Sequence, residues 1–329
     1  MRKLLLGTTA LAAAATLSAN AALADVSISG TTEWHYINFG SQDATLDGDK
    51  FSQDSEIKFK FTNKTDSGLT IGYTVEMESD AGAGGIDESS ISISGGFGSI
   101  MLGQNDGVAT SYAIEAEDAT AEESAGSMAS ATIKTDTDIS LDETDNNKIA
   151  YTLPAMGGFK AGISFEDSGA GSAAANKADI TAVGASFTTE AAGSTLTIGA
   201  ATVTKENSAG TDSDAQNIGV KIASGAATFY AAQSINESSD EDITAQGFGA
   251  KYNLGNGLTL AGFTMTAEDD LDAGEEYTAN SVEASYSIAS GLTAVLNVTN
   301  YDYKAGTNND NAEAADDGTI TKLVIKASF

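Results

Sequence analysis

The sequence predicts an all-β fold, a transmembrane antiparallel barrel of 16 strands. Three observations predict it: apolar and polar residues alternate along segments of about ten residues, short and long connections take turns between these segments, and the lysines of the segments fall opposite the apolar face. Residues 55–62 show the first pattern clearly, with Ile57, Phe59 and Phe61 on one face and Lys58 and Lys60 on the other. Such alternation indicates strands with one apolar side.

The alternation starts at Val26 and continues to the last residue of the chain, Phe329. It predicts strands at 26–39, 54–64, 69–79, 87–95, 98–104, 146–154, 158–167, 178–188, 194–205, 214–223, 226–236, 242–254, 258–267, 277–288, 292–303 and 318–329. In 195–203, 226–232 and 258–265 the pattern is ambiguous and leaves the strand register open. Trp34, Tyr36, Phe39, Tyr301 and Tyr303 lie near strand ends, which suits an aromatic girdle at the membrane interface.

The connections fall into two sets, one short and glycine-rich, the other longer and acidic. A bacterial outer-membrane barrel has tight turns at one rim and long loops at the other. An even number of strands brings both ends of the chain to the short-turn rim. Because a bilayer core offers no water to unpaired backbone groups, the sheet must close on itself. Lysines opposite the apolar face then predict a polar, water-filled interior.

Composition excludes several classes of function. The chain has 47 acidic and 16 basic residues and a net charge of −31, which excludes a nucleic-acid binder. It has no cysteine and one histidine, His35, so we expect no disulfide, no metal site, no cofactor and no catalytic triad. Residues 1–24 have the charged start, apolar stretch and small-residue end of a secretory signal, which leaves 25–329 as one exported barrel domain.

Three motifs carry a resemblance to a known family. They are 97–107 (FGSIMLGQNDG), 147–154 (NKIAYTLP) and the end of the chain, 323–329 (LVIKASF), with apolar residues at alternate positions before a terminal Phe. Together with the signal, they resemble the Gram-negative general porins, which are trimeric outer-membrane diffusion channels of sixteen strands. The family usually has an arginine where Gln104 stands, and the only arginine here is Arg2 in the signal.

The resemblance implies that the longest connection, 105–145, folds into the barrel as the third external loop and narrows the pore. Its acidic residues, with one lysine among them, then form one side of the constriction: Glu115, Glu117, Asp118, Glu122 and Glu123. Any basic wall opposite must consist of lysines, and strand counting places four at similar heights: Lys58, Lys60, Lys148 and Lys322. Phe329 matches the family's outer-membrane assembly signal.

We therefore expect a non-enzymatic, cation-preferring porin of the cell outer membrane that passes small hydrophilic solutes. Its expected partners are two further copies of the chain, outer-membrane lipid and lipopolysaccharide, and the assembly machinery. One alternative is a channel specific for cationic or zwitterionic nutrients. A second is a secreted acidic surface protein that binds calcium, although its acidic runs lack the spacing of an EF-hand.

Overall fold

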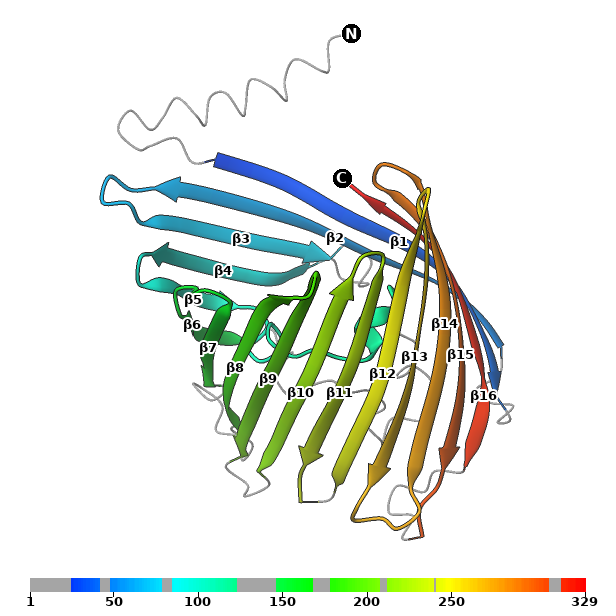
Figure 1. Cartoon of the computed structure of the whole chain (residues 1–329). Coiled ribbons are helices and arrows are strands. Elements are labelled where there is room, and N and C mark those ends of the chain that lie inside the picture. The colour runs from blue at the N-terminus through cyan, green and yellow to red at the C-terminus, as the bar shows by residue number, and fades with distance from the viewer. Residues whose placement is uncertain are drawn as a thin grey trace.

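The computed structural model describes residues 25–41, 48–78, 85–122, 146–167, 178–207, 212–239, 241–307 and 315–329. Sixteen antiparallel strands form one closed barrel, in which each strand pairs with its neighbours in sequence and β1 pairs with β16 (Figure 1). The strands are β1 (Asp25–Ser41), β2 (Gly48–Lys64), β3 (Thr70–Glu78), β4 (Gly85–Gly95), β5 (Gly98–Gln104), β6 (Asn147–Thr152), β7 (Phe159–Asp167), β8 (Ala178–Ala191), β9 (Ser194–Asn207), β10 (Ser213–Ser224), β11 (Ala227–Glu237), β12 (Asp242–Gly255), β13 (Leu258–Asp269), β14 (Glu276–Ala289), β15 (Leu292–Lys304) and β16 (Asp316–Ser328).

The predicted number and order of strands are confirmed, and most strand limits differ by only one to three residues. The largest difference is at β2, which begins at Gly48 although 40–53 reads as a connection. Phe51 explains the longer strand: it pairs with Tyr36 across β1 and stacks on Trp34, with ring centroids 5.5 Å apart. Polar residues surround Phe51, so the sequence there shows no alternation.

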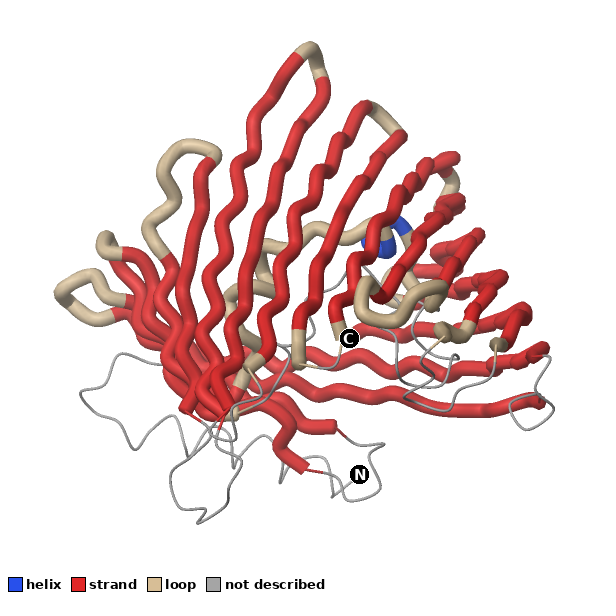
Figure 2. Tube along the Cα trace, turned by 90° about the horizontal axis from the view of Figure 1, so that it is seen from below, coloured by secondary structure: helices blue, strands red, loops and turns tan. Residues whose placement is uncertain are grey.

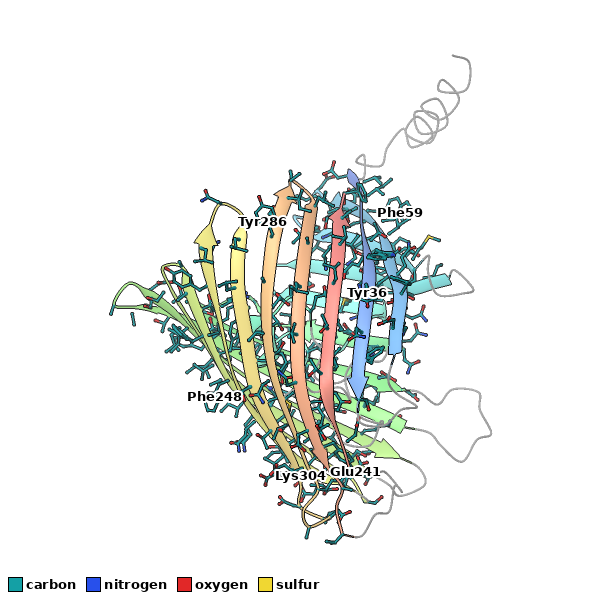
Figure 3. The ribbon with its side chains drawn as sticks, turned by 90° about the vertical axis from the view of Figure 1, so that its right-hand side faces the viewer. Tyr36, Phe59, Glu241, Phe248, Tyr286 and Lys304 are labelled. Atoms are coloured by element: carbon teal, nitrogen blue, oxygen red, sulfur yellow. The ribbon has the colours of Figure 1, made fainter. Side chains whose placement is uncertain are left out.

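The barrel presents its apolar face outward, as the alternation predicts. Ile149, Phe248 and Val282 are exposed by 58%, 65% and 65%. Figure 3 shows Phe248 and Tyr286 on the outer surface, while Lys304 lies at the end of the barrel that carries the long connections. An outward apolar face is what a lipid-exposed barrel requires. No helix within the described residues is long and apolar enough to cross a bilayer.

Three of the expected girdle residues do not face outward: Phe39 packs against a buried inner cluster, and Tyr301 and Tyr303 belong to it. Tyr301 and Tyr303 are each exposed by only 5%, and the cluster also contains Tyr277 and Ile320. Their hydroxyl groups donate hydrogen bonds to Asp316 and Glu275. The register of β15 therefore turns these two tyrosines inward, and one sector of the inner face is packed with side chains.

Both ends of the barrel sequence meet at the short-turn rim (Figure 1). The backbone N–H of Phe329 donates to the carbonyl of Gly30 at 2.9 Å, and the N–H of Gly30 donates to the carbonyl of Phe329 at 3.3 Å. The barrel is closed by these bonds and by the β1–β16 ladder. The predicted signal segment, 1–24, lies outside the described residues.

Candidate functional site in the barrel lumen

The first part of the longest connection, residues 105–122, runs along the inner face of the barrel. Its backbone makes hydrogen bonds with inward side chains of the wall: Val108 N–H donates to Ser164 Oγ at 3.0 Å, and Ile114 is bound through both its N–H and its carbonyl by Asn217. A short 3-10 turn, η1 (Glu117–Ala119), follows, and Figure 2 shows it inside the ring of strands. The wall side chains thus take the place of water as partners for this backbone.

Glycines on the wall let the connection approach this closely. A Cβ at any of three inward positions would overlap a carbonyl oxygen of the connection: Gly199 with Tyr112, Gly219 with Ile114, and Gly249 with Ala116. Nearby, Val108, Ala109 and Tyr112 pack against small and aliphatic inward side chains of β6 and β8–β10. The contact surface is therefore shaped by the absence of side chains at these three points.

The far end of the described segment is held by a buried carboxylate. Glu283 on β14 accepts hydrogen bonds from Ala121 N–H at 2.9 Å and from Glu122 N–H at 3.0 Å. Asn297 on β15 donates to the carbonyl of Glu122 at 3.0 Å. Hydrogen bonds to an ionised group are among the stronger ones, so the segment is fixed across the lumen from β7 to β15.

An open cavity of about 620 Å³ lies between this segment and the wall formed by β2–β7. Equal numbers of basic and acidic side chains line it, together with serines and threonines; the charged ones are Lys58, Lys60, Lys160, Glu76, Glu88 and Asp106. This part of the lumen has room for water and small polar solutes, and its lining can hydrogen-bond with them. It is the candidate functional site.

The predicted acidic residues lie in different environments. Asp118 is exposed, Glu115 is half-buried, and Glu117 is exposed by only 1%. Glu122 is buried, at 7% exposure. Burial raises the pKa of the Glu122 carboxyl and nearby Glu33 raises it further, while Lys322, His35 and Lys326 lower it. Glu123 lies outside the described residues.

The predicted lysines also separate into two groups. Lys58 and Lys60 line the open cavity, where Lys58 forms ion pairs with Glu76 and, at 3.5 Å, with Glu56. Lys148 is buried and pairs with Glu166 at 3.1 Å, and both side chains are exposed by only 1%. Lys322 is buried as well. All four lie on the inner face, but the structure brings only Lys58 and Lys60 together in the open lumen.

Several residues that shape this site do not stand out in the sequence. Glu76, Glu88 and Lys160 line the cavity, and Asn217, Glu283 and Asn297 hold the connection. All six lie on the polar side of their strands, which alternation alone could have shown. Which of them meet the connection depends on the path of the connection, and that path leaves no periodic signal.

Comparisons with known proteins identify the family. A family model described as Gram-negative porin matches residues 7–306. No curated protein matches. Solved structures with the same fold include in-vitro folded OmpT of Vibrio cholerae (11% identity, TM-score 0.71, 94% of this chain and 100% of that one). They also include an anion-selective porin from Comamonas acidovorans (16% identity, TM-score 0.64) and a mutant of the Rh. blastica porin (17% identity, TM-score 0.64). Each of these two matches covers 93% of this chain and 100% of the other chain. This chain belongs to the Gram-negative porin family and is a β-barrel diffusion channel of the outer membrane.

Proposed function

We propose that this channel passes small hydrophilic solutes passively and prefers cations. The observation that carries the proposal is the charge balance of 47 acidic to 16 basic residues in the whole chain. In the open cavity the numbers of basic and acidic side chains are equal, and the charge of Lys58 is already compensated by Glu56 and Glu76. The excess negative charge of the protein therefore sets the potential at the channel mouth and concentrates cations there.

The segment 105–122 supports a second part of the proposal, that the connection 105–145 narrows the passage. The segment occupies the lumen beside the open cavity, and Asp106 lines that cavity. Asp118 is the exposed acidic residue of η1. A carboxylate in a confined channel attracts cations and repels anions, so Asp118 and Asp106 are the acids best placed to act on ions.

The test is the reversal potential of the refolded barrel in a planar bilayer under a salt gradient. We expect the sign of a cation-selective channel, with a larger potential at 0.1 M than at 1 M salt, because the screening length falls from about 10 Å to about 3 Å. Asp118→Asn should reduce the cation preference. Asp66→Asn, which removes an exposed charge from the turn after β2, is the matched control. A reversal potential of the opposite sign contradicts the proposal.

We also propose a homotrimer. The support is the fold shared with OmpT of Vibrio cholerae, which was also solved in a trimer form (12% identity, TM-score 0.67). Chemical cross-linking of the refolded protein should give a species of three chains, and single-channel records should close in three equal steps. A single closing step with no cross-linked species contradicts the trimer.

Export and assembly complete the proposal: residues 1–24 form a cleaved signal, lipid and lipopolysaccharide surround the barrel, and the assembly machinery binds the chain end. Phe329 supports the last point because its side chain is exposed by 84% while its backbone is bound to Gly30. Deletion of Phe329 should lower the amount of barrel in the outer membrane. Unchanged assembly contradicts the role of Phe329.

The second candidate function is a channel specific for zwitterionic or cationic nutrients. The open cavity favours it, because both basic and acidic side chains line it, as binding of the two ends of a zwitterion requires. Saturable block of ion current by a zwitterionic amino acid, absent with an uncharged sugar of similar size, would support it. The family assignment contradicts the other alternative, a secreted calcium-binding surface protein.

A further inference from the structure

The single histidine of the chain lies between two carboxylates that are distant in sequence. His35 and Glu33 are on the inner face of β1, and Glu122 is at the end of the described part of the connection. One ligand atom from each of these residues lies within 4.8 Å of the others. A lone histidine in a sequence does not indicate a metal site, because the partners that would complete the site come from other parts of the fold.

We propose that Glu33, His35 and Glu122 form a binding site for a divalent transition-metal ion of the Zn²⁺ class. One imidazole nitrogen and two carboxylate oxygens are a set of protein ligands that Zn²⁺ accepts, with water completing the coordination. Bonds of about 2.0–2.2 Å to one ion place its ligand atoms roughly 3.3–3.5 Å apart. Glu33 Oε2 and His35 Nε2 already lie 3.2 Å apart, and the Glu122 oxygen lies within 4.8 Å of both, a separation that rotation of its flexible side chain can reduce.

The backbone on both sides of the site is already fixed. Glu122 is held through its N–H by Glu283 and through its carbonyl by Asn297, each at 3.0 Å. His35 and Glu33 lie in a strand that pairs on both sides, with β2 and β16. The side chains of His35 and Glu33 are exposed by only 15% and 13%. An ion bound there would therefore link the fixed backbone of the connection to β1.

The two oxygens of Glu33 have separate partners. Oε1 forms an ion pair with Lys326 on β16, whereas Oε2 faces His35 Nε2 at 3.2 Å. An ion can thus take Oε2 and the imidazole Nε2 while Lys326 keeps Oε1. The Nε2 lone pair must be free for this, so the ring proton moves to Nδ1 and the hydrogen bond between His35 and Glu33 is replaced by two bonds to the ion.

The ligand set also predicts selectivity among ions. Imidazole suits Zn²⁺, Ni²⁺ and Cu²⁺, whereas Ca²⁺ and Mg²⁺ prefer sites made of oxygen alone. Lys326 and Lys322 lie close enough to act electrostatically on Glu122, and they compete with the ion for the negative charge of Glu122. We therefore expect binding of Zn²⁺ without comparable binding of Mg²⁺ at the same concentration.

The test uses the refolded, untagged chain 25–329 with isotope-labelled histidine. Because the chain has one histidine and no cysteine, a change in the imidazole NMR signal reports His35 alone. Zn²⁺ should shift that signal and bind at one ion per chain by calorimetry, while Mg²⁺ should leave it unchanged. An imidazole signal that saturating Zn²⁺ does not move overturns the proposal, and this measurement needs no variant.

Variants then assign the carboxylates. His35→Gln and Glu122→Gln should each lower the Zn²⁺ affinity at least about tenfold. Asp66→Asn removes an exposed acid in the turn after β2 that is not in the cluster, and it should keep the wild-type affinity. Wild-type affinity in His35→Gln overturns the proposal. The result is independent of cation preference, because binding is measured without ion flow.

Discussion

Two parts of the inner wall place their inward residues in different surroundings. The covered wall, which contacts residues 105–122, consists of inward residues of β6–β15 such as Gly219, Asn217 and Glu283. The open wall, formed by inward residues of β2–β4, carries Lys58, Lys60, Glu76 and Glu88 beside a cavity. On the covered wall the buried carboxylate of Glu283 holds backbone in place. Charges on the open wall face the space through which solutes can pass.

The contrast shows that facing inward is not sufficient for a role in permeation. Lys148 and Lys60 both lie on the polar side of their strands, yet Lys148 is buried against Glu166 and Lys60 lines the cavity. A buried pair acts on stability, because removing one partner leaves the other charge without compensation. An exposed charge acts on ions, because it changes the potential in the lumen at little cost to folding.

The largest effect should come from breaking the buried pair. Lys148→Met leaves Glu166 buried without its ammonium partner, and we expect a loss of about 3–5 kcal/mol in the free energy of unfolding. Unfolding by denaturant, followed by circular dichroism, measures it. The double variant with Glu166→Met should recover most of the loss, because no isolated charge remains. A loss below about 1 kcal/mol is typical of an exposed ion pair and would contradict the role of Lys148 in stability.

Loss of the carboxylate that holds the connection should come next. Glu283→Gln keeps the shape of the side chain but removes its charge, and the carboxylate accepts hydrogen bonds from the N–H groups of Ala121 and Glu122. We expect a loss of about 1.5–3 kcal/mol in the free energy of unfolding. Hydrogen exchange at these two amides should become faster than in the wild type. Glu190→Gln, at an exposed site near the turn after β8, is the control and should leave their exchange unchanged.

A side chain on the covered wall should push the connection away. Gly219→Val places a Cβ where the carbonyl of Ile114 lies, so we expect a cost of about 1–3 kcal/mol and a changed single-channel conductance. Ala200→Val places the same side chain on the exposed outer face of β9 and should change neither quantity by much. Equal conductance in both variants means that the connection does not limit the current.

The smallest effect on stability should come from the open wall. Lys60→Gln should change the free energy of unfolding by less than about 0.5 kcal/mol, because Lys60 is exposed. It should nevertheless increase cation preference at 0.1 M salt, since a positive charge is removed from the cavity lining. Lys148→Met should instead lower the free energy of unfolding and leave the cation preference unchanged. Unchanged selectivity in Lys60→Gln would contradict the role assigned to the open wall.

Most of the fold could be predicted from the sequence, because a lipid-facing strand must alternate. Ile57, Phe59 and Phe61 show this pattern directly. The pattern fails where a strand extends beyond the apolar belt, as around Phe51, and where inward positions are themselves apolar. Tyr301 and Tyr303 illustrate the second case: position near a strand end predicted an interface, and the β15 register turned them inward.

The candidate site was less predictable for a different reason. Alternation correctly placed Lys58, Lys60, Lys148 and Lys322 on the inner face, but it carries no information about what covers each of them. Which inward side chains are buried depends on the path of residues 105–122, and that path follows from tertiary contacts such as those of Glu283 and Asn297. The glycines at 199, 219 and 249 were a usable signal, since glycine is unfavourable inside strands.

Gly30 and Phe329 donate backbone hydrogen bonds to each other, so the strand pairing of the finished barrel does not show which strand was synthesised first and which last. Every strand has two partners, so the seam between the oldest and the newest strand is paired like any other. Joining the two ends by a short linker and opening the chain at another tight turn, such as that after β10, would preserve every ladder. Such a permuted chain would show whether folding needs a particular starting strand or only the complete circle.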